Sequence, residues 1–299
     1  MHFIDKEKKI YEMSKDNVPN LTVNDGDTVV METYDCYTGQ MKNENSSAGG
    51  SGWDGINPAT GPVYVEGLKP NDVLKADIQT ITLSDRGVMV NGPGAGVMGS
   101  ILTERHVKFI DIDSEKELLN FNGIDIPLNP MIGVIGVAPL NTPVNNGTPD
   151  NHGGNMDSVK VTEGASLYLP VYHDGALFAL GDVHAAMGDG EVSISGVEIS
   201  AEVTVRLQKA DNMKISHPLL SDDDGVYMMV SDESLDTAVD LSVKEMIRFL
   251  HPYTDLSLNE ITMLMSIVGQ TQINQVVDPK KTARFFVPRY VLNHYNIPI

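Results

Sequence analysis

The chain has 299 residues, of which 41% are hydrophobic, a content typical of folded globular proteins. Its 41 acidic and 21 basic residues give a formal net charge of −20. Nucleic acids and anionic membranes are bound through clustered lysine and arginine, so this charge argues against both as partners. Cys36 is the single cysteine, which excludes an intrachain disulfide. Because the sequence has no signal-peptide pattern and no long apolar run, we expect a cytoplasmic protein.

Residues 1–210 carry the pattern of a mainly β protein. Alternating, β-branched segments separated by turn residues occur at 21–34, 167–178 and 192–207. The apolar run 130–139, interrupted by Gly and Pro, is typical of a buried strand. Turn signals recur roughly every eight to twelve residues, which is the spacing expected for a β-sandwich or barrel. We therefore expect this part to form a β-rich catalytic unit.

A polar segment rich in glycine, serine and asparagine interrupts the strand pattern at residues 39–60. Loops of this length in a compact domain are usually functional or mobile. Trp53 lies inside it, and we interpret it either as part of a lid or subunit contact, or as an anchor that packs the loop down.

The pattern changes in residues 211–299, for which we predict a smaller α+β part packed on the first. Apolar residues recur at helical spacing in 235–250 and again in 257–268. Ser234 is a candidate N-cap for the first of these helices. A strand is expected near the end of the chain.

The candidate chemistry lies in two glycine-containing loops, HGGNMD at 152–157 and GDVHAAMGDGE at 181–191. Imidazole and carboxylate groups are the ligands that borderline and hard divalent cations prefer. His184 and Asp182 would share one face of a strand and could bind one cation. Glycines after His152 would let its loop fold over that cation. Asp35 follows another strand and would reach the same centre only if the sheet brings it there.

If a cation is bound, a hydrolytic mechanism follows. A nearby carboxylate such as Glu191 would act as general base for a water molecule. Asn155, or backbone N–H groups of Gly153 and Gly154, would hold the oxyanion. The alternative is that these side chains are turn aspartates and hydrogen-bonded histidines, because no HExxH or CxxC pattern strengthens the metal hypothesis.

Two other readings stay open. A serine hydrolase lacks support because the chain has no GxSxG motif. Cys36, which follows Asp35 and has Glu32 upstream, raises a thiol amidase as an alternative. A non-catalytic β-rich protein that binds a small ligand or a metal would use the same loops.

Four segments in order, 32–40, 61–74, 152–157 and 175–192, resemble the acetamidase/formamidase family. The resemblance implies hydrolysis of a short aliphatic amide, of the acetamide or formamide type, to ammonia and a carboxylate. It also implies a β-rich fold with a small α+β part, and a homodimer or higher homo-oligomer.

The resemblance further implies a divalent metal, zinc or calcium among the candidates. Carried over by position, it indicates Asp35, His152 and His184 as ligands. The acidic residues expected close by are Asp157, Asp182 and Glu191.

One position departs from the family pattern. Met187 stands where the family usually has glutamine before Gly-Asp-Gly-Glu. If this side chain contacts substrate, a thioether in place of an amide would favour a more apolar substrate.

Overall fold

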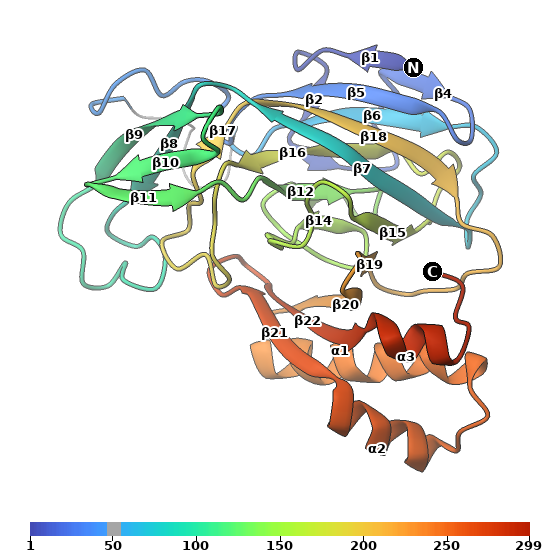
Figure 1. Ribbon diagram of the computed structural model, residues 1–299. Helices are drawn as coiled ribbons and strands as arrows, with labels where there is room; N and C mark the ends of the chain where they lie inside the picture. The colour runs from blue at the N-terminus through green and yellow to red at the C-terminus, as the bar shows by residue number, and fades with distance from the viewer. Residues whose placement is uncertain (47–54) are drawn as a thin grey trace.

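The computed structural model describes residues 1–46 and 55–299, so the segment around Trp53 lies outside the described residues. Two large β-sheets form most of the molecule, and helices occur only near the C-terminus of the described chain (Figure 1). A further small sheet pairs β3 (Glu12–Met13) with β13 (Val144–Asn145). The expected mainly β class is confirmed.

The first large sheet has nine strands and runs through both parts of the chain. Most neighbours are antiparallel, but β1 pairs with β5 in parallel. In spatial order its strands are β1 (His2–Ile4), β5 (Thr28–Thr33), β18 (Ala201–Lys209), β7 (Val73–Leu83), β15 (Ser166–Pro170), β19 (Leu219–Ser221), β20 (Gly225–Asp232), β22 (Lys281–Pro288) and β21 (Gln270–Gln275).

The second large sheet has eleven strands and carries most of the sequence motifs. Its main path is β11 (Ile124–Pro127), β10 (Leu118–Phe121), β9 (His106–Asp113), β8 (Arg86–Asn91), β17 (Glu198–Ile199), β16 (Phe178–His184), β12 (Met131–Gly136) and β14 (Gly153–Asn155). Off this path, β6 (Ala59–Val65) pairs with β16, β2 (Lys9–Ile10) and β4 (Leu21–Val23).

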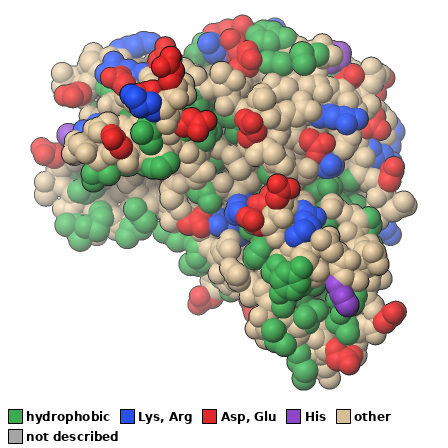
Figure 2. Space-filling model, in the orientation of Figure 1, with side chains coloured by type: hydrophobic (Ala, Val, Ile, Leu, Met, Phe, Trp, Pro, Cys, Tyr) green, Lys and Arg blue, Asp and Glu red, His purple; other side chains and the backbone are tan. Residues whose placement is uncertain are grey.

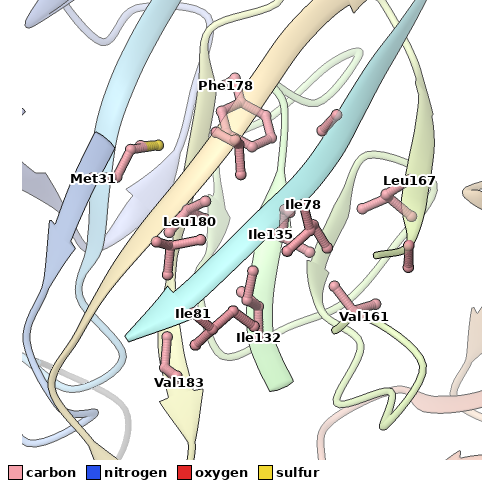
Figure 3. Close-up of a cluster of buried hydrophobic side chains, with 14 of the residues drawn as sticks. Met31, Ile78, Ile81, Ile132, Ile135, Val161, Leu167, Phe178, Leu180 and Val183 are labelled. Carbon is pink, nitrogen blue, oxygen red and sulfur yellow. The ribbon is translucent and has the colours of Figure 1, made fainter. Parts of the chain in front are cut away.

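The main hydrophobic core lies between the two sheets (Figure 3). Met31 and Ile78 come from the nine-stranded sheet, and Ile132 and Leu180 come from the other. Strand β5 alternates between fully and partly buried residues, because successive side chains of a strand point to opposite faces. This packing makes the architecture sandwich-like, and neither sheet closes into a barrel within the residues described.

The C-terminal part adds helices to the far strands of the nine-stranded sheet. Helix α1 (Leu235–Leu250) packs on β20 and β22 and is followed by a short 3₁₀ turn (His251–Tyr253). Helices α2 (Leu258–Val268) and α3 (Arg289–His294) complete this part. The nine-stranded sheet continues across residue 210, where we predict the boundary between the two parts.

The helix boundaries follow from capping chemistry. The Ser234 hydroxyl accepts a hydrogen bond from the Thr237 N–H, as expected for an N-cap. Ser257 and Glu260 form a reciprocal capping box that starts α2. Both helices were predicted from periodicity, and both lie where the sequence indicates.

The surface mixes acidic and basic side chains, with hydrophobic side chains gathered over the C-terminal helices (Figure 2). On α2, Leu258, Met263 and Ile267 are exposed. No helix in the described part of the chain has both the length and the apolar character needed to cross a membrane.

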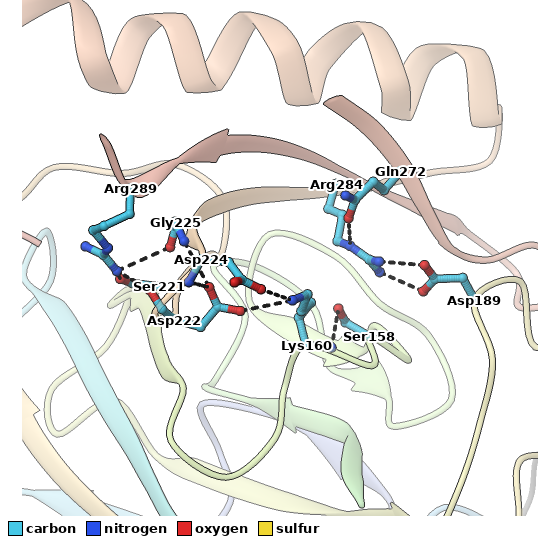
Figure 4. A network of polar contacts seen from close by, with 10 residues as sticks. All are labelled: Ser158, Lys160, Asp189, Ser221, Asp222, Asp224, Gly225, Gln272, Arg284 and Arg289. Carbon is cyan, nitrogen blue, oxygen red and sulfur yellow. Dashed lines mark hydrogen bonds and ion pairs between the residues drawn. The ribbon is translucent and has the colours of Figure 1, made fainter. Parts of the chain in front are cut away.

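An arginine from the C-terminal part holds a loop of the other part (Figure 4). The Arg284 guanidinium on β22 donates to both carboxylate oxygens of Asp189, over 2.8 and 2.6 Å. It also donates to Asn274 Oδ1 and Gln272 Oε1. The Arg284 side chain is only 3% exposed, so these hydrogen bonds satisfy a buried charge.

We predict that Arg284→Met lowers the free energy of unfolding by about 1–3 kcal/mol, because charge-assisted hydrogen bonds are lost and a buried acceptor, Asn274 Oδ1, is left without its donor. Arg86→Met is the matched control, since Arg86 and Asp111 form a largely exposed ion pair. That substitution should cost less than about 1 kcal/mol. Urea unfolding of both variants measures the difference, and equal losses would contradict the assigned role of Arg284.

Candidate active site

The candidate site begins at the end of strand β16, which delivers Asp182 and His184. His184 and Glu198 are directly paired residues of the antiparallel strands β16 and β17. His184 Nε2 lies 3.0 Å from Glu198 Oε2 and 3.6 Å from Asp182 Oδ1. All three side chains are buried. The sheet register therefore places one imidazole between two carboxyl groups.

Three more acidic side chains reach this point from loops. Asp157 follows β14, Glu191 lies in the loop after β16, and Asp278 lies between β21 and β22. All three are buried. Asn155 Nδ2 donates a 2.9 Å hydrogen bond to Asp278 Oδ2, which joins the C-terminal part to the site.

The side chains form two groups whose ligand atoms lie close enough to hold a cation. In each group the atoms lie within 4.8 Å of one another, and every residue is buried. The first group is Asp157, His184 and Glu191. The second group is Cys36, Asp182 and Glu198.

Many polar atoms of these groups have no hydrogen-bond partner within the described residues. Buried polar atoms are normally hydrogen-bonded, so such a concentration is unusual. The unpartnered atoms are both ring nitrogens of His184, both carboxylate oxygens of Asp157, Asp182 Oδ1, Glu191 Oε2 and Glu198 Oε2, and the neighbouring Asn155 Oδ1 also lacks a partner. His184 Nε2 lies close to Glu198 Oε2 and Asp182 Oδ1, but neither contact has the geometry of a hydrogen bond. Donor atoms of this chemistry, directed together and left without partners, fit a cation.

The pKa values of the carboxyl groups show how strongly this burial opposes negative charge. Burial and the Asp182 carboxylate raise the pKa of Asp157 to about 7. Burial and the Asp157 carboxylate raise the pKa of Glu191 well above its usual range. Burial and Asp182 also raise the pKa of Glu198 to about 8. In the absence of a compensating positive charge, these acids would hold protons near neutral pH.

The imidazole responds in the opposite direction. Burial alone would lower the pKa of His184, but the carboxyl groups of Glu198 and Asp182 outweigh it and raise that pKa well above the ordinary value. The centre therefore favours positive charge, on an imidazolium or on a cation.

The backbone is strained where it carries these side chains. Asp157, Asp182 and Glu191 have φ values of 42°, 55° and 46°. Positive φ is uncommon for residues other than glycine and costs on the order of 1–3 kcal/mol each. The surrounding fold maintains this strain at the residues that face one another across the site.

A cavity of 660 Å³ opens beside the two groups of candidate ligands. Cys36, Asn155, Asp182 and Glu191 all line it, and so do two basic residues, Arg105 and Lys281. A small substrate could therefore reach the carboxyl groups without a rearrangement of the described residues.

Two of the expected ligands lie outside both groups. Asp35 Oδ1 accepts hydrogen bonds from the Tyr37 and Gly39 N–H groups, which is the turn-capping arrangement. His152 lines a separate cavity of 410 Å³, and burial lowers the pKa of its imidazole to about 4. Its two ring nitrogens have no hydrogen-bond partner in the described structure.

The expected substrate contacts are also distributed between cavities. Gly153 and Gly154 pair with β12, where a side chain at Gly153 would collide with the Ile135 carbonyl. Met187 lines a neighbouring cavity of 500 Å³, which shares Glu191 with the first. Asn155 does face the first cavity, but its amide N–H donates to Asp278.

Sequence reasoning misses three residues of the site: Cys36 and Glu198, which belong to one of the two groups, and Asp278, which lines the cavity. The sequence suggests Cys36 only as a nucleophile, although it lies beside Asp35, an expected ligand. Glu198 lies in an ordinary strand, and only its pairing with His184 reveals it. Asp278 lies in the turn between β21 and β22, and nothing in the local sequence distinguishes it from an ordinary turn aspartate.

Solved structures resemble this chain over nearly its full length. A crystal structure of a predicted acetamidase/formamidase from Thermoanaerobacter tengcongensis is 41% identical, with a TM-score of 0.96 over 100% of this chain and 99% of that one. A crystal structure of an acetamidase from Bacillus halodurans is 40% identical, with a TM-score of 0.94 over 99% of this chain and 100% of that one.

Among curated relatives, a putative formamidase of Schizosaccharomyces pombe is 25% identical over 252 residues. That match spans 64% of this chain and 61% of the relative, so the chain covers about three fifths of the relative's length. The model of the acetamidase/formamidase family matches residues 3–146 and 141–294. These matches extend over nearly all of the chain, which therefore belongs to the acetamidase/formamidase family.

Proposed function

We propose that the protein hydrolyses short aliphatic amides, of the acetamide or formamide type, to ammonia and a carboxylate with the help of a divalent cation. The observation that carries this proposal is the convergence of buried imidazole and carboxylate atoms next to an open cavity, whose wall includes Asp182, Glu191 and Glu198. Family membership supports the reaction, and the donor set supports the cation.

Asp157, His184 and Glu191 would hold the cation. Their ligand atoms lie within 4.8 Å of one another, and those of Asp157 and His184 all lack hydrogen-bond partners in the described chain. Three protein ligands leave open coordination positions, as catalytic metal sites require. The chemistry that such an ion supplies is Lewis-acid activation of an amide carbonyl and of water. Zinc fits the imidazole and carboxylate set, and calcium would need additional oxygen ligands.

The residues of the chain would divide the remaining work. Glu191 faces the cavity and has two carboxylate oxygens; with one held by the cation, the other is our candidate for the general base that takes a proton from the attacking water. Asp278, held by Asn155, is a second carboxyl group positioned to carry a proton towards the leaving ammonia. Burial raises the pKa of Asp278 well above its usual range, so it can keep a proton for that transfer.

Substrate binding would use the wall of the same cavity. Asn57 is buried there and donates a 3.2 Å hydrogen bond to Asp182 Oδ2, which fixes that carboxylate. One N–H of the Asn155 amide donates to Asp278, so its second N–H, together with backbone N–H groups near the cavity, would hold the oxyanion. A cytoplasmic location and assembly into a homodimer or larger oligomer complete the proposal.

A cysteine-dependent amidase is the second candidate, because Cys36 lines the cavity near Glu198. Burial and the Glu198 carboxyl group raise the pKa of the Cys36 thiol well above its usual range. A nucleophilic cysteine needs the opposite shift, so this geometry favours the cation mechanism.

Removal of divalent cations should reduce ammonia release from short amides to background, and added zinc or calcium should restore it. A coupled ammonia assay over a series from formamide to longer aliphatic amides measures both effects. Full activity in metal-free protein would contradict the cation requirement. Absence of ammonia release under every condition would instead favour a non-catalytic binding protein.

Gly133→Ala should disrupt the centre by steric contact. An added Cβ at Gly133 would lie 2.4 Å from Asp157 Oδ1 and 2.8 Å from Asp182 Oδ2. We expect cation binding to weaken and unfolding stability to fall by about 1–3 kcal/mol from overpacking. Gly188→Ala, where a Cβ meets no atom within 4 Å, is the matched control. Calorimetric titration with zinc should separate the two variants, and equal affinities would argue against the ligand set.

Glu191→Gln should lower turnover by about 10²–10⁴-fold, the usual contribution of a general base. Zinc content should persist, because Asp157 and His184 remain. Steady-state kinetics together with metal analysis tests this assignment. If the variant loses zinc as well, Glu191 is a required ligand and another group is the base.

A further inference from the structure

The wall of the cavity holds a second set of donor atoms that the proposed mechanism does not use. Cys36, Asp182 and Glu198 offer one sulfur and two carboxylate oxygens within 4.8 Å of one another. They come from three separate elements: the turn after β5, the end of β16 and the start of β17. All three line the 660 Å³ cavity, so an ion could enter from solvent.

The carboxyl groups of this set lack partners although they are almost fully buried. Asp182 and Glu198 are each 3% exposed, and Cys36 is 6% exposed. Asp182 Oδ1 and Glu198 Oε2 have no hydrogen-bond partner among the described residues. Buried acceptors in that state are costly unless a cation or a donor compensates them.

Charge balance also calls for more than one ion. A divalent cation held by Asp157 and Glu191 is neutralised by those two carboxylates. Asp182 and Glu198 then remain buried, with His184 Nε2 as the basic group within 4 Å of both. Lys281 also lines the cavity and donates to the Asp278 backbone carbonyl, so its charge is set against the buried Asp278 carboxyl group. A second cation would offset the remaining negative charge.

We propose that Cys36, Asp182 and Glu198 form a second cation site, next to the first, in which the Cys36 thiolate is a ligand. The proposal rests on the cation site of the proposed function. Binding forms a sulfur–metal bond and releases the thiol proton to solvent. A thiolate is a soft ligand, so this site selects zinc or a related transition metal over calcium or magnesium.

Cobalt(II) provides a direct test because Cys36 is the single cysteine of the chain. Any thiolate-to-cobalt charge-transfer band in the near ultraviolet must therefore come from this side chain. Metal-free full-length protein is titrated with cobalt(II), and bound zinc is counted separately by equilibrium dialysis and elemental analysis. Cys36→Ser is the test variant. Asp157→Asn is the control, because Asp157 belongs only to the first group.

We expect two cations per wild-type chain and a charge-transfer band. Cys36→Ser should bind one cation without the band, and Asp157→Asn should bind one cation and keep it. If Cys36→Ser does not fold, as judged by circular dichroism, the wild-type spectrum and Asp157→Asn still decide the question.

Two cations without a band would overturn the second site. One cation with a band would keep Cys36 as a ligand but overturn the first centre, and with it the proposal of two cations. One cation without a band in wild-type protein would also overturn the second site but leave the first centre standing. No cation binding at all would remove both proposals.

Discussion

Buried negative charge is the constraint on which the rest of this structure depends. Asp157, Asp182, Glu191, Glu198 and Asp278 are all less than 10% exposed; the last four line one cavity, and Asp157 lies beside Glu191. Isolated buried carboxylates cost several kcal/mol or more, and they normally protonate, pair or bind metal. The described residues contribute His184 as the one imidazole among them. A cation is the simplest group that reconciles these side chains with a folded protein.

The fold accommodates this cost by fixing the acids from several directions. Strand pairing sets His184 opposite Glu198, while Gly133 leaves space beside β12 for two carboxylates. Asp157 adopts a left-handed backbone conformation that few residues tolerate. Arg284 holds the loop before Glu191 from the C-terminal part. The site is therefore preorganised by both parts of the chain and not by one local motif.

Much of the fold was predictable because local patterns determine local elements. Period-two alternation indicates most strands, and helical periodicity indicates the two longer helices, the first with Ser234 as its expected N-cap. The pairing order of the sheets was not predictable, since it depends on contacts between residues far apart in the chain. For example, strands from both sides of residue 210 share the nine-stranded sheet, which no local pattern indicates.

The residues of the site also fall into those that the sequence indicates and those that it does not. His184, Asp182, Asp157 and Glu191 lie in short motifs, and the structure brings them together. His152 belongs to the same motif as Asp157, but β14 lies between them, and His152 lines another cavity.

Cys36 and Glu198 enter the site through strand ends that only the folded sheet places together. Asp278 arrives from a hairpin of the C-terminal part. Sequence spacing does not predict these contacts, because they join residues that are distant in the chain.

The most direct measurement is an anomalous difference map, recorded at the zinc absorption edge, from crystals of the protein grown with zinc. The account predicts a strong peak in contact with Asp157, His184 and Glu191. A map without a peak at these side chains, with the imidazole and carboxyl groups hydrogen-bonded to one another or to water, would contradict it.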